Sequence, residues 1–164
     1  DALDGTGARV LDTRKTTPLL RELDKYAVRC GGGVNKRFGL YDCAMVKDNH
    51  IVAAGSVAGA VEAIREAFPE VPIQVEVESE RQALEAIDAG VTFLMLDNMM
   101  PADMARLVKK IRGLADRYGV IQCEATGGLT LDNAAEVGAT GVDFMSVGAL
   151  THSSPILDIA LDLR

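Results

Sequence analysis

The stretch Ala8-Arg-Val-Leu-Asp-Thr-Arg-Lys15 places a short apolar run directly before a cluster of polar and charged residues, and this order recurs along the chain. Apolar runs occur at Ala8–Leu11, Ala44–Val46, Ile73–Val77, Thr92–Leu96 and Val142–Val147, with a shorter one at Val120–Cys123. Helical patterns lie between them, at Pro18–Val28, Ser56–Phe68, Glu80–Ala89, Pro101–Tyr118 and Leu131–Val137. Apolar strands that alternate with helices indicate an α/β protein with a parallel sheet.

The residues that end each run favour one kind of parallel sheet. The runs end in Asp12–Lys15, Lys47–Asn49, Glu76–Ser79, Asp97–Asn98, Glu124–Gly128 and Ser146–Gly148. Polar side chains at every strand end converge on one rim in a (β/α) barrel, whereas an open doubly wound sheet binds mainly at a switch point. A complete barrel takes roughly 250 residues. The prediction is therefore a TIM-like, incomplete (β/α) barrel of about six strands, one domain over residues 1–164.

Composition limits the class of ligand. The net charge is −7, yet Arg14, Lys15, Lys36, Arg37 and Lys47 lie in one region. This indicates a pocket for a compact polyanion rather than a surface for nucleic acid. No apolar run approaches the roughly 20 residues of a membrane span, so no membrane partner is expected. Three widely spaced cysteines fit neither a disulfide framework nor a zinc site, which indicates a reducing, cytoplasmic location.

Seven blocks, in order and from Ala8 to Leu163, resemble quinolinate phosphoribosyltransferase, the carboxylating nicotinate-nucleotide pyrophosphorylase of NAD biosynthesis. They are Asp12–Pro18, Gly31–Gly33 leading to Asn35–Arg37, Lys47–His50, Val75–Glu78, Leu96–Asn98, Glu124–Gly128 and Val147–His152. The resemblance implies transfer of a phosphoribosyl group from phosphoribosyl pyrophosphate to quinolinate with Mg²⁺, giving nicotinate mononucleotide, pyrophosphate and carbon dioxide. It also implies a homodimer in which the partner's amino-terminal α/β sandwich domain closes each rim. That domain has no counterpart here, so the chain is expected to be a fragment with weak activity on its own.

The resemblance also implies roles for particular residues. Lys15, Lys47, Glu76 and Asp97 are the expected catalytic residues, and Glu76 and Asp97 the expected metal-side carboxylates, partly through substrate and water. The expected substrate-binding residues are Thr13, Arg14, Lys15, Lys36, Arg37, Lys47, Glu76, Asp97, Thr126, Gly127, Gly128, Val147, Gly148, Ala149 and His152. The sequence departs from the family at Lys36, where histidine is usual, and at Leu19, where glycine usually follows the proline.

The residue types suit this chemistry. Arginine pairs bidentately with carboxylates, so Arg14 and Arg37 are natural clamps for a diacid, while lysine supplies a point charge. Glu76, on an inward strand face, would bind a cation or a hydroxyl, or pair with a lysine at the barrel mouth. Gly127-Gly128 before a helix near Leu131 is typical of an anion cradle. The sequence leaves open whether Lys36 binds a carboxylate or is solvated.

Three alternatives remain open. A paralogue from molybdenum-transport loci shares the Thr-Arg-Lys and triple-glycine blocks but usually lacks the Lys47–His50 block. A Schiff-base lyase would use Lys47 as a buried amine nucleophile. An anion-binding barrel without turnover needs only the cationic rim.

Overall fold

A parallel sheet of six strands runs through the computed structural model, which describes residues 2–163. The strands are β1 (Arg9–Leu11), β2 (Ala44–Val46), β3 (Ile73–Val77), β4 (Phe93–Asp97), β5 (Gln122–Thr126) and β6 (Phe144–Ser146). Their order is β1-β6-β5-β4-β3-β2, and every neighbouring pair is parallel. Because β1 and β2 are the outer strands and do not pair, the sheet is a curved, open barrel. The predicted incomplete barrel is confirmed.

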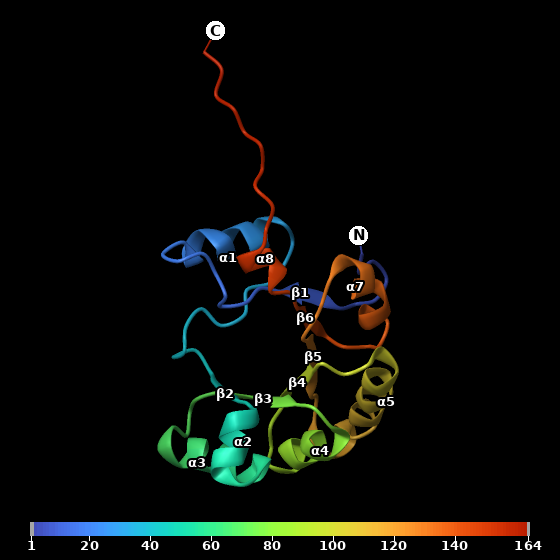
Figure 1. The fold of residues 1–164 in the computed structure, drawn as a ribbon. Helices are drawn as coiled ribbons and strands as arrows, with labels where there is room; N and C mark the ends of the chain where they lie inside the picture. The colour runs from blue at the N-terminus through green and yellow to red at the C-terminus, as the bar shows by residue number, and fades with distance from the viewer. Residues whose placement is uncertain (1, 164) are drawn as a thin grey trace.

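Helices surround the sheet (Figure 1). They are α1 (Arg21–Cys30), α2 (Asp48–Ala54), α3 (Val57–Ala67), α4 (Glu80–Asp88), α5 (Pro101–Arg112), α6 (Ala115–Tyr118), α7 (Leu131–Gly138) and α8 (Ala149–His152). Three sequence expectations need correction: neither α2 nor α8 was foreseen, and the helix predicted over Pro101–Tyr118 is broken at Gly113 into α5 and α6. Within residues 2–163, the structure has no helix of the length and apolar character that a bilayer crossing requires.

The core lies between the sheet and its helices. Val75, Val77, Leu94 and Leu96 are fully buried there, and Leu107 of α5 belongs to the same apolar cluster. Burying a side chain of this size stabilises the fold by about 1.5–3 kcal/mol. Strand residues alternate between faces, so the neighbours of these core residues point into the barrel. The inner face is therefore available for polar side chains.

The connection between α1 and β2 crosses the open side of the barrel (Figure 1). Val34, within it, forms a parallel bridge with Leu11: its N–H donates to Val10 O at 2.8 Å, and its carbonyl accepts from Asp12 N at 3.2 Å. A Cβ on Gly33 would lie 2.6 Å from Val28 Cγ1, so this glycine permits close packing on α1. The triple-glycine run thus belongs to a close-packed loop rather than a nucleotide-binding turn.

Exposed apolar side chains are most numerous in two places. One group lies on α1 and the loop that follows it: Leu20, Leu23, Tyr26, Leu40 and Tyr41. The other lies on residues 153–163, which have neither helix nor strand and extend away from the barrel (Figure 1). That segment exposes Ile156, Leu157, Ile159, Leu161 and Leu163. Contiguous exposed apolar surface of this kind marks a region that another protein surface can cover.

Leu19 occupies a backbone conformation that favours glycine. Leu20 N donates to Thr17 O at 3.0 Å, which closes a four-residue turn with Pro18 in its second position. Leu19, in the third position, has φ 64°. A turn with proline second and positive φ third is of type II, for which glycine is the preferred third residue. This explains why the family motif has glycine where this chain has leucine.

Leu19→Gly is expected to stabilise the protein by about 0.5–1 kcal/mol. The substitution removes a left-handed strain of roughly 1–2 kcal/mol, partly offset by the greater backbone freedom of glycine in the unfolded chain. No packing is lost because the Leu19 side chain is fully exposed. Urea unfolding would measure the change, with Leu20→Gly, at φ −108°, as the control that should not gain stability. A loss of stability in Leu19→Gly would show that the turn imposes no strain.

Candidate functional site

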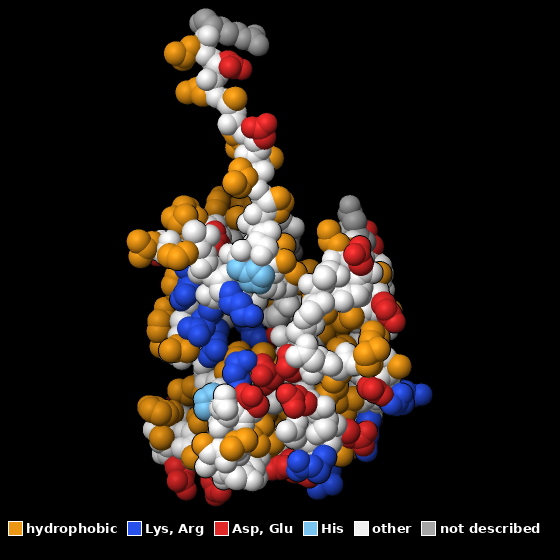
Figure 2. Space-filling model, viewed as in Figure 1, with side chains coloured by type: hydrophobic (Ala, Val, Ile, Leu, Met, Phe, Trp, Pro, Cys, Tyr) orange, Lys and Arg blue, Asp and Glu red, His pale blue; other side chains and the backbone are white. Residues whose placement is uncertain are grey.

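The carboxyl ends of the strands form one rim, and most of the residues predicted from sequence lie along it. Thr13, Arg14 and Lys15 follow β1; Lys47 follows β2; Glu76 lies in β3; Asp97 ends β4; Thr126 ends β5, and Gly127 and Gly128 follow it; Val147, Gly148 and Ala149 follow β6. The register pairs Asp97 with Thr126 and Leu11 with Ser146, so these ends are level with their neighbours. Figure 2 shows a group of Lys and Arg side chains beside a group of Asp and Glu side chains on this face.

The cationic side of the rim contains three guanidinium groups. The pKa of Arg14 is lowered by burial and then by the charges of Arg37 and Arg21. Arg21 is held by the carbonyls of Arg14, at 3.2 Å, and Phe38, at 3.1 Å. Among residues 2–163, no carboxylate forms an ion pair with Arg14 or Arg37. Mutual repulsion without a counter-ion among the described residues makes this a candidate site for an anion.

Arg37 reaches towards β2. Its Nη1 donates to Cys43 O at 3.2 Å, and its Nη2 lies 3.3 Å from Met45 Sδ. A carbonyl and a thioether leave the positive charge uncompensated while they fix the plane of the guanidinium. This orientation leaves the rest of the donor fork available to a carboxylate.

The anionic side of the rim is formed by Glu76 and Asp97. Lys47 Nζ lies 2.5 Å from Glu76 Oε2, so this lysine joins the cationic and anionic sides. Burial and then the charge of Glu76 raise the pKa of Asp97, while a hydrogen bond from Asn98 Nδ2 at 2.8 Å opposes the shift. The carboxylate of Asp97 is therefore strained in its ionised form, as expected of a group that meets a ligand.

The two carboxylates are of the type that magnesium takes as protein ligands. Within residues 2–163 no group of three or more His, Cys, Asp or Glu side chains is arranged to hold a metal. Magnesium usually takes only one or two carboxylates and completes its shell with water and substrate phosphates. The repulsion between Glu76 and Asp97 would be relieved by such a cation.

Asp97→Asn is expected to make the folded protein more stable at neutral pH. The folded pKa of Asp97 is raised, so the ionised carboxylate costs free energy above the unfolded value of 3.8. The gain, a rise of about 1–3 °C in Tm, should shrink as the pH falls through the raised pKa and vanish below 3.8. Thermal unfolding from pH 3 to pH 8 would measure it, with exposed Glu62→Gln on α3 as the control. A gain that is independent of pH would contradict this assignment.

Two glycine loops form the end of the rim after β5 and β6. Gly127 and Gly128 have φ 88° and 58°, and a Cβ on Gly127 would overlap Asn98 Oδ1. After them Thr130 and Asn133 form the capping box that begins α7. Across from this loop, a Cβ on Gly148 would lie 2.7 Å from His152 Nε2. Both loops thus hold backbone close to other groups, as anion-binding loops do.

A buried hydroxyl lies beside these loops. Ser146 Oγ has no hydrogen-bond partner among residues 2–163, and the residue is only 8% exposed. Thr13, on the neighbouring β1 side, shares a 2.8 Å hydrogen bond with Thr151 Oγ1 of α8. An unused buried hydroxyl directly before the Val147–Ala149 loop is a further donor for an anion.

Asp12 fixes residues on α1 and on the loop after it, a role that the sequence did not predict. Its fully buried carboxylate accepts from Lys25 Nζ at 2.5 Å, Asn35 Nδ2 at 2.5 Å and Lys36 N at 2.8 Å. Lys25 is also buried, on the face of α1 that carries Val28. The sequence signal for this role was the three-residue spacing of Lys25 and Val28, which places a lysine on the same helix face as an apolar residue.

Lys36 does not direct its ammonium towards the open rim. Its Nζ lies 2.7 and 2.6 Å from the two carboxylate oxygens of Glu124, a fully buried residue of β5. Met95 Sδ is 3.4 Å away, also on the inner face. Burial lowers the pKa of Lys36, and the Glu124 carboxylate opposes that shift. The sequence had left Lys36 between carboxylate binding and solvation, and its partner is a carboxylate of the protein itself.

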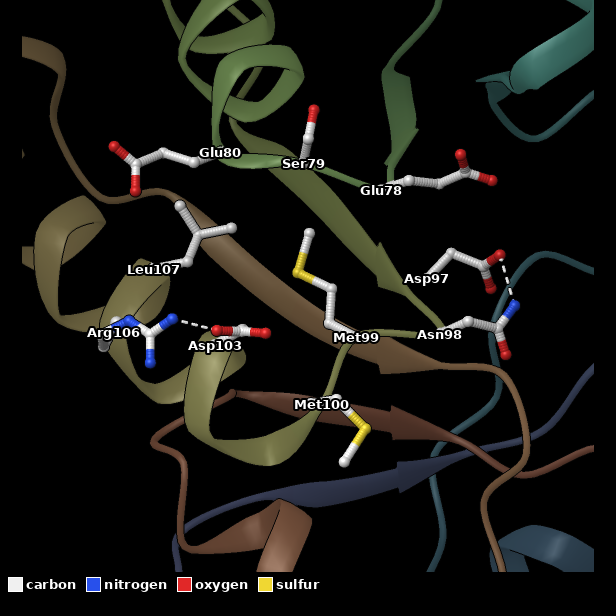
Figure 3. Close-up of a pocket in the computed structure, with 10 residues that line it drawn as sticks. All are labelled: Glu78, Ser79, Glu80, Asp97, Asn98, Met99, Met100, Asp103, Arg106 and Leu107. Carbon is white, nitrogen blue, oxygen red and sulfur yellow. Dashed lines mark hydrogen bonds and ion pairs between the residues drawn. The ribbon is translucent and has the colours of Figure 1, made fainter.

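A pocket of about 510 Å³ adjoins the acidic side of the rim (Figure 3). Glu78, Asp97 and Asn98 line the end near the rim, and Met99 and an Asp103–Arg106 ion pair line the end near α5. None of the rim's Lys or Arg side chains lines it. It therefore extends the acidic side outward and is separate from the cationic side.

Comparisons with known proteins agree on one family. A family model described as the C-terminal domain of quinolinate phosphoribosyl transferase matches residues 1–162. The nicotinate-nucleotide pyrophosphorylase (carboxylating) of Mycobacterium leprae is 50% identical, with 99% of this chain and 56% of that protein covered. The probable enzyme of the same name from Bacillus subtilis is 48% identical, with 98% and 54% covered. The chain thus spans about half the length of the curated relatives that it matches.

Solved structures give the same result. NadC from Streptococcus pyogenes superimposes with a TM-score of 0.84 at 43% identity, covering 93% of this chain and 52% of that one. The nicotinate-nucleotide pyrophosphorylase from Francisella tularensis gives a TM-score of 0.85 at 38% identity, covering 92% and 52%. This chain belongs to the family of the C-terminal domain of quinolinate phosphoribosyltransferase.

Proposed function

We propose that this chain is the barrel part of an enzyme that transfers the phosphoribosyl group of phosphoribosyl pyrophosphate to quinolinate. The products are nicotinate mononucleotide, pyrophosphate and carbon dioxide. The observation that carries the proposal is that cationic and anionic side chains lie on the same rim. Among the described residues no carboxylate pairs with Arg14 or Arg37, and both lie on the same rim as Glu76 and Asp97. A diacid would bind on one side and a metal-linked sugar pyrophosphate on the other.

Quinolinate would bind on the cationic side. Its two adjacent carboxylates match the forks of Arg14 and Arg37, and Lys15 and Lys47 add point charges. Lys47 already pairs with Glu76, so it would hold the diacid while keeping its position over β3. Lys36 belongs to this group by its place in the sequence, but its ammonium is held by Glu124.

Phosphoribosyl pyrophosphate would bind along the rest of the rim. Glu76 and Asp97 would accept hydrogen bonds from the ribose hydroxyls and face Mg²⁺, which supplies charge neutralisation for the pyrophosphate. The 5′-phosphate would lie between the β5 and β6 loops. The residues proposed to hold it are Thr126, Gly127, Gly128, Val147, Gly148, Ala149 and His152, with Thr13 beside them.

The chemistry then needs little beyond positioning and charge. The pyridine nitrogen of quinolinate forms a bond to the anomeric carbon as the bond to pyrophosphate breaks. Carbon dioxide leaves from the carbon next to the nitrogen, which is now cationic and stabilises the electron pair left behind until a proton from solvent replaces the lost group. Arg14 and Arg37 would orient the ring, and the rim charges would stabilise the departing pyrophosphate.

We also propose a homodimer in a reducing compartment. The exposed apolar surface on α1 and residues 153–163 supports a covering partner domain. The three cysteines are unpaired, as in proteins of a reducing compartment, and this is the basis for a cytoplasmic location. The relative in Arabidopsis thaliana is named as chloroplastic, so the compartment differs among relatives.

A product assay tests the function. Purified chain is incubated with quinolinate, phosphoribosyl pyrophosphate and Mg²⁺, and nicotinate mononucleotide is quantified beside calorimetric titration with quinolinate. Quinolinate binding with no product would favour the anion-binding alternative for this chain alone, and no binding would oppose the proposal. Borohydride trapping with a carbonyl substrate would detect a Lys47 Schiff base, which the 2.5 Å pair with Glu76 disfavours.

A further inference from the structure

The Lys36–Glu124 ion pair lies inside the barrel, and its lysine directly precedes Arg37. The Lys36 side chain is 9% exposed and that of Glu124 is fully buried, so both charges are removed from water. A buried pair costs desolvation energy that its attraction often fails to recover, so it is weak evidence for overall stability. A role in fixing geometry is the better explanation for its presence.

Lys36 is held at both ends. Its backbone N–H donates to Asp12 Oδ1 at 2.8 Å, and its carbonyl accepts from Lys25 Nζ at 3.2 Å. Its side chain crosses the interior to Glu124 on β5, in register with Met95 of β4. One residue thus connects the β1 side of the barrel to the middle of the sheet.

The next residue completes a bridge over the open side. Arg37 contacts Cys43 O and Met45 Sδ, and Met45 belongs to β2. No hydrogen bonds join β1 to β2 in the sheet, so the segment 33–37 provides the link between them. The direction of Arg37 therefore depends on how firmly Lys36 is fixed.

We propose that Glu124 is a positioning residue: through Lys36 it fixes the segment 33–37 across the open side of the barrel and so sets the orientation of Arg37. The proposal deepens the proposed function, because Arg37 is there a clamp for the diacid. It assigns Lys36 a role in holding this segment and leaves carboxylate binding to Arg37. Glu124 needs no contact with any ligand.

Amide hydrogen exchange of purified protein tests the proposal without a ligand. In Glu124→Gln, which keeps shape but removes charge, exchange at residues 34–37 should accelerate at least about tenfold. Glu85→Gln, which breaks the exposed pair with Arg81, is the matched control and should leave that segment unchanged. Lys36→Met/Glu124→Met replaces both charges with apolar side chains and should return exchange to within about threefold of the parent. Glu124→Asp, shorter by one methylene, gives the same reading if the Gln variant does not fold.

Quinolinate affinity provides the second measurement. Glu124→Gln should weaken it at least about tenfold, with recovery in the double variant, because Lys36 itself is not the ligand contact. Unchanged exchange in the folded Glu124 variants would overturn the proposal, and so would faster exchange with unchanged affinity. If the parent does not bind quinolinate, the proposed function fails, whereas the exchange result still decides whether Glu124 fixes the segment.

Discussion

Replacing Arg14, Arg37 or Lys47 by alanine is expected to weaken quinolinate binding by about 2–5 kcal/mol, the usual loss when one partner of a desolvated charge pair is removed. Arg14 and Arg37 pair with no carboxylate in the part of the chain that the structure describes, so their interaction with the ligand would not be shared. Lys47→Ala should have a second effect, because it also leaves Glu76, beside Asp97, without its ion-pair partner. Its loss should therefore weaken binding on both sides of the rim.

Calorimetric titration with quinolinate would measure these losses. Arg81→Ala is the matched control, since that side chain is 80% exposed on α4 and pairs only with Glu85 in the described residues. It should change affinity by less than about 0.5 kcal/mol. Parent-like affinity in all three rim variants would place the diacid elsewhere on the molecule. A loss confined to Lys47→Ala would point instead to the acidic side of the rim.

The fold was predictable because its strands are buried on the helix side and apolar. Runs such as Ile73–Val77 appear directly in the sequence, and the length short of a full barrel indicated an open sheet. The misses have local causes. Helix α2 has seven residues and no buried side chain, so no apolar periodicity marked it. The break between α5 and α6 comes at Gly113. A single glycine in a helical pattern does not show whether the helix ends there.

The rim was predictable for a topological reason, whereas its supports were not. The carboxyl ends of the strands converge in any parallel barrel, so the sequence alone predicted that Arg14 and Asp97 lie on the same rim. The Lys36–Glu124 pair joins residues 88 positions apart, and nothing in either local sequence identifies the other. Substrate roles for these residues stay predictions, because the geometry gives their positions and the family gives their chemistry.

Asp12→Ala is expected to destabilise the fold by about 3–5 kcal/mol, the cost of leaving one buried ion without its partner. Lys25 is 3% exposed and would lose its counter-ion, the Lys36 N–H would lose its acceptor, and Asn35 Nδ2 would keep only the Lys25 carbonyl. A single carboxylate therefore satisfies donors from α1 and from the segment that bridges the open side.

Urea unfolding would measure the loss as a lower midpoint with an unchanged slope. Glu80→Ala, which breaks the exposed pair with Lys110, should cost about 1 kcal/mol or less. Lys25→Met/Asp12→Ala should recover roughly half of the loss, because the unpaired charge is gone while the Lys36 N–H still lacks an acceptor and Asn35 Nδ2 keeps only the backbone carbonyl of residue 25. Full recovery would mean that only the Lys25 charge mattered. If Asp12→Ala is as stable as Glu80→Ala, water reaches Lys25. In that case Asp12 does not hold the rim together.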